Sequence, residues 1–151
     1  MAEIAISTAR VVRLFGFEPK VAFVSHTTFG QPLTSRTKHI RKAVDILKYK
    51  KVDFEFDGDM QPDVALNAEY EELYPFSKIV GKANILIMPG QHSAAISYKM
   101  MKTLGGTKVI GPLLIGLGLP IEIAPLRSST SELINLASIA AYSADIIDYK
   151  K

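Results

Sequence analysis

The stretch DGDMQPDVAL, residues 57–66, decides the fold of this chain of 151 residues. It sets three aspartates, a glycine and a proline directly behind an alternating apolar segment, 52–56, that is expected to be a strand. In folds that alternate strands with helices, ligands bind at the carboxyl ends of the strands. The stretch therefore predicts an α/β fold with a ligand site close to residues 57–66.

The segments on both sides of this stretch alternate in the same way. Strands are expected at 21–24, 52–56, 84–88, 108–110, 113–115 and 121–123, and helices at 3–15, 64–73, 93–104, 131–142 and in a segment that Ser35 could cap. The predicted fold is α/β, a three-layer, doubly wound and mainly parallel sheet. A helix that begins almost at the first residue, with no strand before it, favours the interpretation that the chain is a fragment.

Composition narrows the class of protein. With 48% hydrophobic residues the chain can build one core, so a single domain over 1–151 is expected. No apolar run approaches the roughly 18 residues of a membrane span. The absence of cysteine excludes disulfides and thiolate chemistry and agrees with a cytoplasmic protein. The net charge of +3 accompanies no recognition motif, so neither nucleic acid nor a membrane is an expected partner.

The loop 25–31 is the first candidate site. It offers anion ligands of two kinds, the hydroxyl groups of Ser25, Thr27 and Thr28 and backbone N–H groups that Gly30 makes accessible. The alternative is that these are ordinary loop residues. The helix that follows carries four basic residues, which either attract a phosphorylated ligand or form a solvated face: Arg36, Lys38, Arg41 and Lys42. A ligand cleft is expected between this loop and residues 59–63.

The three aspartates of the opening stretch allow several interpretations. Asp57, Asp59 and Asp63 could hold a divalent metal ion or act as general acids and bases. Their spacing is not that of a calcium loop, and capping of the next helix by Asp59 or Asp63 is the simpler role. The three histidines have no partner at a metal-ligand spacing, so no metal site is expected in this chain.

Several motifs resemble one known family, in the same order along the chain. They are VSHTTFG at 24–30, GDMQPDVAL at 58–66, GKAN at 81–84 and NLASIA at 135–140. The chain resembles the second half of a phosphate acetyltransferase domain, an isocitrate dehydrogenase-like lobe, in the version fused to the C-terminus of bacterial NADP-dependent malic enzymes. The resemblance implies a single lobe over 1–151, in which 125–151 is a terminal helical segment that packs on a missing lobe or on a partner chain.

The resemblance also implies a role. The parent protein would decarboxylate malate to pyruvate with NADP and a divalent metal in upstream domains, while this fragment would hold no cofactor and no catalytic residue. It would instead sense acetyl-CoA or a related CoA or phosphate metabolite and assemble a homo-oligomer. The expected ligand-binding residues are Ser25, Thr27, Thr28, Gly30, Asp59, Gln61, Asp63 and Arg127.

Two departures from the family pattern bear on the chemistry. Where active acetyltransferases resemble one another in a Leu-Ser-Arg-Gly segment, this chain reads Ala124-Pro125-Leu126-Arg127, and Glu132 stands in the place of an aspartate. Proline and leucine can neither donate a hydrogen bond from the side chain nor carry charge, so the transferase chemistry is expected to be lost. The Gly-Asn pair before Ile96 likewise reads Ala-Ala. A working phosphate acetyltransferase and an oligomerisation module without a ligand remain the alternatives.

Overall fold

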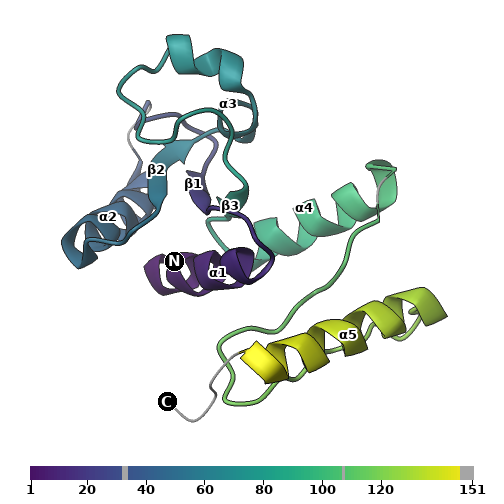
Figure 1. Ribbon diagram of the computed structural model, residues 1–151. Coiled ribbons are helices and arrows are strands. Elements are labelled where there is room, and N and C mark those ends of the chain that lie inside the picture. Colours follow the sequence, from purple (N-terminus) through teal and green to yellow (C-terminus); the bar gives the residue numbers. More distant parts are fainter. Residues whose placement is uncertain (32–33, 107, 147–151) are drawn as a thin grey trace. The chain divides into compact units, whose positions relative to one another are not determined.

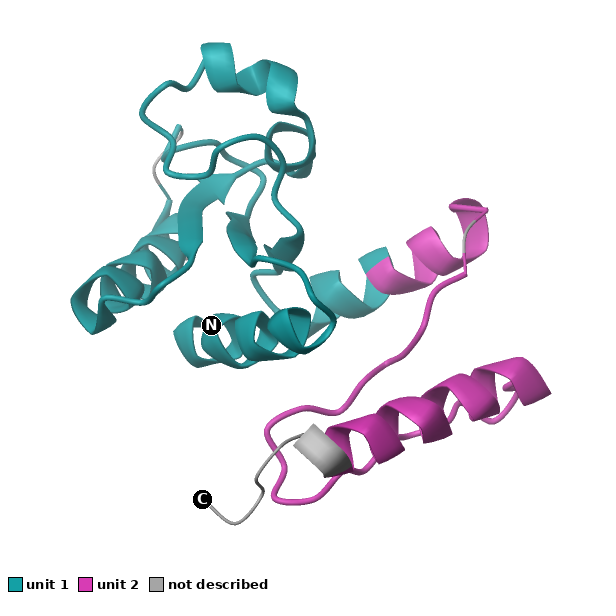
Figure 2. Cartoon of the chain, viewed as in Figure 1, with its two compact units in different colours: residues 1–97 teal, residues 98–151 magenta. Residues whose placement is uncertain are grey.

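The computed structural model describes residues 1–31, 34–106 and 108–146, and it divides into two compact units, 1–97 and 98–151 (Figure 2). The first unit contains the sheet (Figure 1). Its elements are α1 (Ala2–Leu14), β1 (Lys20–Val24), α2 (Ser35–Lys50), β2 (Glu55–Met60), α3 (Pro62–Leu66), the 3-10 helix η1 (Ala68–Glu72), β3 (Ile85–Ile87) and the start of α4 (Gln91–Leu104).

The sheet has three parallel strands in the order β2-β1-β3. Side chains of β1 alternate between its two faces, as strand geometry requires. Val21 and Phe23 belong to a core with residues of α1 and α2, whereas Ala22 and Val24 belong to a second core with Ala65 of α3. Both faces are therefore covered, and the predicted three-layer α/β fold with a parallel sheet is confirmed.

The strand predicted at 52–56 is wrong in its position. β2 runs from Glu55 to Met60, so the acidic motif lies inside the strand and not behind it. Asp57 and Asp59 have a low propensity for strands. Both carboxylates accept hydrogen bonds in the folded chain, and these bonds outweigh the low strand propensity. Gly58 pairs with Phe23, and a Cβ at Gly58 would lie 2.7 Å from the Phe23 Cβ. Strand β1 can approach this closely only because residue 58 has no side chain.

The helix predicted at 64–73 is two short helices. Asn67 separates them with an extended backbone, φ −122° and ψ 116°, and its side chain accepts a hydrogen bond from Glu69 N at 3.1 Å. The cap predicted at Ser35 is also wrong. Thr34 is the N-cap of α2, and it forms a reciprocal capping box with Thr37.

The second unit holds the end of α4 and the helix α5 (Thr130–Ile146). No described residue of 108–129 belongs to a strand, so the three strands predicted there are wrong. A strand needs a partner for its backbone groups, and Leu114 N donates instead to the Glu122 carboxylate at 3.1 Å. Among the described residues, no helix is long and apolar enough to cross a membrane.

Candidate functional site

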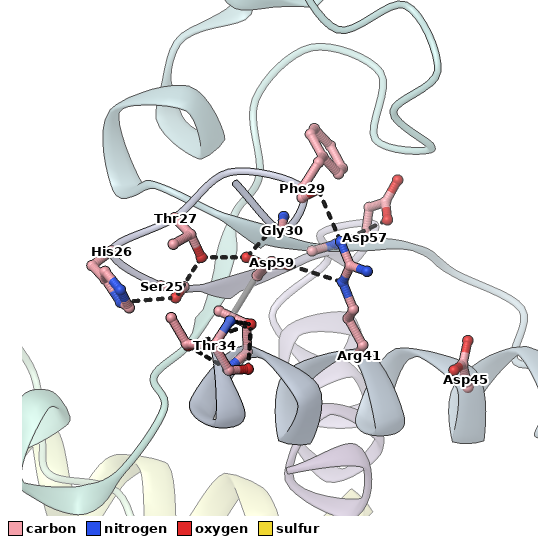
Figure 3. A network of polar contacts seen from close by, with 12 residues as sticks. Ser25, His26, Thr27, Phe29, Gly30, Thr34, Arg41, Asp45, Asp57 and Asp59 are labelled. Atoms are coloured by element: carbon pink, nitrogen blue, oxygen red, sulfur yellow. Dashed lines mark hydrogen bonds and ion pairs between the residues drawn. The ribbon is translucent and has the colours of Figure 1, made fainter. Parts of the chain in front are cut away.

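The loop that follows β1 lies at the carboxyl end of β2, where the fold class places ligands (Figure 3). Two backbone hydrogen bonds attach it there. Ser25 N donates to Met60 O at 2.9 Å, and Phe29 N donates to Asp59 O at 2.6 Å. The loop thus continues the pairing of the two strands beyond the sheet.

Gln61 joins the loop to the end of β2, in the region where the sequence predicts a ligand cleft. Its backbone N–H donates to the Thr28 hydroxyl at 3.2 Å, and its side-chain amide donates to the His26 carbonyl at 3.2 Å. The loop and the end of β2 are therefore in direct contact through Gln61, and the ligand cleft stays a prediction.

Asp59 anchors the loop from inside. Its side chain has no exposed surface, and its Oδ2 accepts hydrogen bonds from the Thr27 hydroxyl and from Gly30 N at 3.2 Å. Its Oδ1 is buried and has no hydrogen-bond partner in the part of the chain that the structure describes. The nearest charge is Arg41, whose Nε lies 3.6 Å from that oxygen.

The other two aspartates of the motif have separate surroundings. Asp57 accepts hydrogen bonds from Gly58 N at 2.9 Å and from Lys78 N at 2.8 Å, and so it ties a later loop to the sheet. Asp63 is exposed in the first turn of α3. The N-cap of that helix is Gln61, whose side chain forms no capping hydrogen bond, so capping by Asp59 or Asp63 is wrong. Within 1–31, 34–106 and 108–146, no three His, Asp or Glu side chains are grouped to hold a metal ion.

Arg41 is the site residue that the sequence did not single out. Its Nη2 donates to the Phe29 carbonyl at 2.9 Å while its Nε faces Asp59, so one guanidinium spans the loop and β2. The side chain is 46% exposed, which leaves part of it open to solvent. In the sequence Arg41 is one of four basic residues on one helix, and nothing in that pattern separates it from the others.

The structure divides the predicted ligand-binding residues by burial. Thr27, Gly30 and Asp59 are buried, and the hydrogen bonds of Asp59 to the other two shape the loop. Ser25 and Thr28 are half-buried, and the Ser25 hydroxyl lies 3.1 Å from the Thr27 hydroxyl. Gln61 and Asp63 are exposed. No ligand role of any of them is tested by this geometry.

The segment that departs from the family pattern forms a turn in the second unit. Ser128 donates twice to the Pro125 carbonyl, from its backbone N at 3.0 Å and from its hydroxyl at 2.8 Å. Leu126 and Arg127 at the tip of this turn are exposed. The ligand role of Arg127 stays a prediction.

Glu132 has a structural function in the same unit. It accepts hydrogen bonds from Lys102 Nζ at 2.6 Å and from Ser129 N at 2.8 Å, the second of which belongs to a capping box at the start of α5. The hydrogen bond from Lys102, followed by those from Ser129, lowers the pKa of Glu132 to about 2. Glu132 is therefore charged at neutral pH and engaged at a helix end.

Two hollows among the described residues of the first unit do not offer a ligand site at the loop. A groove of about 510 Å³ runs along residues 47–48 and 51–56 and Lys78, at the amino end of β2. Ligands of parallel sheets bind at the opposite end. A pocket of about 20 Å³ beside Phe29 and Tyr74 has room for little more than a water molecule. The loop surface therefore remains the candidate site.

Comparison with known proteins places this geometry in context. The chain is 49% identical over 144 residues to the NADP-dependent malic enzyme of Rhizobium meliloti, covering 95% of this chain and 19% of that protein. It is 34% identical over 145 residues to the phosphate acetyltransferase of Bacillus subtilis, covering 95% of this chain and 45% of that protein. The chain thus spans less than half the length of these relatives.

Solved structures agree with these relatives. A phosphotransacetylase from Streptococcus pyogenes superposes with a TM-score of 0.88 at 34% identity, covering 95% of this chain and 44% of that chain. The EutD phosphotransacetylase from Staphylococcus aureus gives a TM-score of 0.85 at 32% identity, covering 95% and 45%. Residues 1–141 match the phosphate acetyl/butaryl transferase family. With a parallel sheet, a loop built on a buried aspartate and a family match over nearly its whole length, the chain belongs to the phosphate acetyl/butaryl transferase family.

Proposed function

We propose that this chain is a regulatory and assembly part of an NADP-dependent malic enzyme that senses acetyl-CoA or a related CoA or phosphate metabolite and does not itself catalyse a reaction. One observation carries the proposal. The chain is 49% identical to a malic enzyme but 34% identical to a phosphate acetyltransferase, over nearly the same residues. Its sequence is thus nearer to this fused protein than to that free-standing transferase.

The loss of transferase chemistry is inferred from the turn at 125–128. The family resemblance implies a serine and an arginine at the positions of Pro125 and Leu126, where they would serve acyl transfer. Leu126 is fully exposed and has neither charge nor donor. Glu132, in the place of the family's aspartate, is already bonded to Lys102 and Ser129. The side chains of Pro125 and Leu126 therefore cannot stabilise a developing oxyanion.

The effector is proposed to bind on the outer side of the loop 25–31. Ser25 and Thr28 supply half-buried hydroxyl groups, and Arg41, which donates to the Phe29 carbonyl of the same loop, supplies a partly exposed cation. Hydroxyl groups and a guanidinium are suitable donors for the phosphate groups of a CoA ligand. Malate, NADP and a divalent metal would be bound by upstream domains that are not in this chain.

The test uses the complete malic enzyme that carries this chain. Acetyl-CoA is titrated while malate oxidation is followed, and formation of acetyl phosphate from acetyl-CoA and phosphate is assayed in the same preparation. The proposal expects malate oxidation to change with acetyl-CoA and acetyl phosphate to stay at background. Malate oxidation that is indifferent to acetyl-CoA would overturn the sensing role.

A working phosphate acetyltransferase is the second candidate. It is favoured by the TM-score of 0.88 with a phosphotransacetylase and by Arg127, one position beyond the arginine that the resemblance implies. Acetyl phosphate formation above background, lost in Arg127→Ala, would establish it. The double variant Pro125→Ser, Leu126→Arg is the informative control, because it restores both side chains that the resemblance implies. Activity gained only in that variant would support the loss of chemistry in the natural chain.

A further inference from the structure

The guanidinium of Arg41 is held at two points that belong to different segments. Nη2 donates to the Phe29 carbonyl at 2.9 Å, and Nε lies 3.6 Å from Asp59 Oδ1. Phe29 is part of the loop, whereas Asp59 is part of β2. A single side chain from α2 therefore joins the loop to the strand that supports it (Figure 3).

The carboxylate on which Arg41 acts has no substitute partner. Asp59 Oδ2 accepts hydrogen bonds from the Thr27 hydroxyl and from Gly30 N. Within the described ranges, Asp59 Oδ1 has no hydrogen bond. A buried carboxylate oxygen is costly without a compensating charge or donor. Arg41 is the cation that meets this requirement in the described part of the chain.

Gly30 leaves space in the loop for the guanidinium of Arg41. A Cβ built on Gly30 would lie 1.7 Å from Arg41 Nη2 and 2.6 Å from its Cζ. Gly30 also has a φ of +80°, a conformation that favours glycine. The loop thus accommodates Arg41 through the missing side chain, in addition to using glycine for its backbone.

We infer that Arg41 is the positioning residue of the loop 25–31: its guanidinium, seated against Gly30 and paired with the buried Asp59, fixes the conformation in which Ser25 and Thr28 present their hydroxyl groups. This rests on the proposed function, because the loop is the proposed effector site. It gives Arg41 a second role besides the direct contact proposed above, and it explains how that site is kept in shape before a ligand arrives. Preorganised donors bind more tightly because less conformational freedom is lost on binding.

Amide hydrogen exchange measures how often the loop opens in the absence of a ligand. In the chain of 151 residues, Arg41→Ala should speed exchange of the Gly30 amide at least about tenfold, since that amide donates to Asp59. Arg10→Ala is the matched control, because Arg10 is also an exposed helical arginine and its side chain forms no hydrogen bond or ion pair with the described residues. Equal exchange in wild type and Arg41→Ala would overturn the inference.

A glycine pair keeps the test valid if Arg41→Ala fails to fold. Gly30→Ala and Gly81→Ala both force a side chain onto a positive φ, +80° and +75°, but a Cβ at Gly81 meets nothing within 4 Å. Only Gly30→Ala should loosen the loop beyond this shared strain, because its new Cβ would displace the Arg41 guanidinium. An identical loop exchange in the two glycine variants would contradict the role of Arg41.

Acetyl-CoA titration of the complete malic enzyme separates this inference from the proposed function. Arg41→Ala should raise the acetyl-CoA concentration for half-maximal effect at least about tenfold, with partial recovery in Arg41→Lys, which keeps the charge but not the planar fork. An unchanged half-maximal concentration would overturn the role of Arg41 at the effector site. If wild type does not respond to acetyl-CoA while loop exchange changes as expected, the proposed function fails and the positioning role of Arg41 stands.

Discussion

Thr27 supplies the hydroxyl group that bonds a buried carboxylate. Its side chain has no exposed surface, and its Oγ1 donates to Asp59 Oδ2. Since Asp59 Oδ1 already lacks a hydrogen bond in the described residues, the second oxygen cannot easily lose its donor. The two residues are 32 positions apart in the chain and form part of the connection between the loop and β2.

Replacement of Thr27 by the isosteric valine should therefore destabilise the protein. The loss of one hydrogen bond to a buried charged group costs about 1.5–3 kcal/mol in the free energy of unfolding. Urea denaturation measures it, and Thr27→Ser is the control because it keeps the hydroxyl group. Wild-type stability in Thr27→Val would mean that the hydroxyl contributes nothing to the loop anchor.

The ion pair between Lys102 and Glu132 should depend on pH. The folded pKa of Glu132 lies near 2, below its ordinary value of 4.5, so its ion pair stabilises fully above about pH 4.5 and is lost as the pH falls towards 2. In Lys102→Ala the pKa of Glu132 should rise towards the ordinary value, since the largest cause of the shift is removed while Ser129 still donates. Titration of the Glu132 carboxyl by NMR measures this change. Lys99→Ala, an exposed position on the same helix, should leave it unaltered.

At the scale of single residues, the sequence predicted which segments meet but not how they bond. The hydroxyl-rich loop and the acidic motif were both recognised from residue types, and they do lie together. Arg41 was not recognised, because its importance arises from a spatial approach to Gly30 that no local pattern records. The roles of Asp57 and Asp59 likewise depend on partners 21 and 32 residues away.

At the scale of elements, the start of helix α2 depends on which residue caps it. Thr34 accepts Thr37 N at 3.3 Å, and Thr37 Oγ1 accepts Thr34 N at 2.9 Å, so both orphan donors are satisfied by threonines. Thr34→Ala should cost about 1 kcal/mol in the free energy of unfolding. Ser35→Ala should cost little, since Ser35 lies inside the helix. Thermal melting of both variants distinguishes the two candidate caps, and a larger loss in Ser35→Ala would reverse the assignment.

The close approach of β1 and β2 gives a second prediction at this scale. In Gly58→Ala the new Cβ would lie 2.7 Å from both the Cβ and the carbonyl oxygen of Phe23. Such overpacking costs about 1–3 kcal/mol or more in the free energy of unfolding. Gly90→Ala is the control, because a Cβ there meets nothing within 4 Å. Equal urea midpoints for the two variants would show that the strands can move apart freely.

Element boundaries were predicted well where periodicity alone decides them. The helices α1, α4 and α5 were each predicted from their apolar pattern and are observed. β2 was misplaced because Asp57, Gly58 and Asp59 lower strand propensity, and only their bonds to distant residues compensate. The strands predicted in 108–123 are wrong for a different reason. Apolar residues favour a strand there, but a strand also needs a neighbouring strand, which the apolar pattern does not supply.

For the whole molecule, exposed apolar side chains of the second unit point to self-association, which we propose. They are Met100, Met101, Leu104, Ile110, Leu114, Ile115, Leu117, Leu119, Ile121, Ile123, Leu126, Leu133 and Ile134. Monomers rarely expose so much apolar surface in one stretch, and homo-oligomers cover it symmetrically. Sedimentation velocity at high micromolar concentration should therefore give species heavier than the 16.6 kDa of one chain. A single 16.6 kDa boundary would argue against assembly through this chain.

The sequence predicted the fold class and the family of the whole molecule, because both depend on the order of strands, helices and motifs. It did not predict a division into units 1–97 and 98–151. That division depends on which apolar segments find partners within the chain. The segment 108–129 is as apolar as the segments around β1, yet it contributes no strand in the described residues.

The central place of β1 has a consequence for how the protein is made. Both neighbours of β1 are synthesised after it, and the bond from Lys20 N to Asn84 Oδ1, 2.7 Å long, joins residues 64 positions apart. A growing chain leaves the ribosome with Val21 to Val24 uncovered until β2 and then β3 have emerged. Such non-local pairing is slow to form, because a long loop must close before any contact rewards it. During translation, the most deeply buried strand of the finished protein is thus the one that waits longest for its partners.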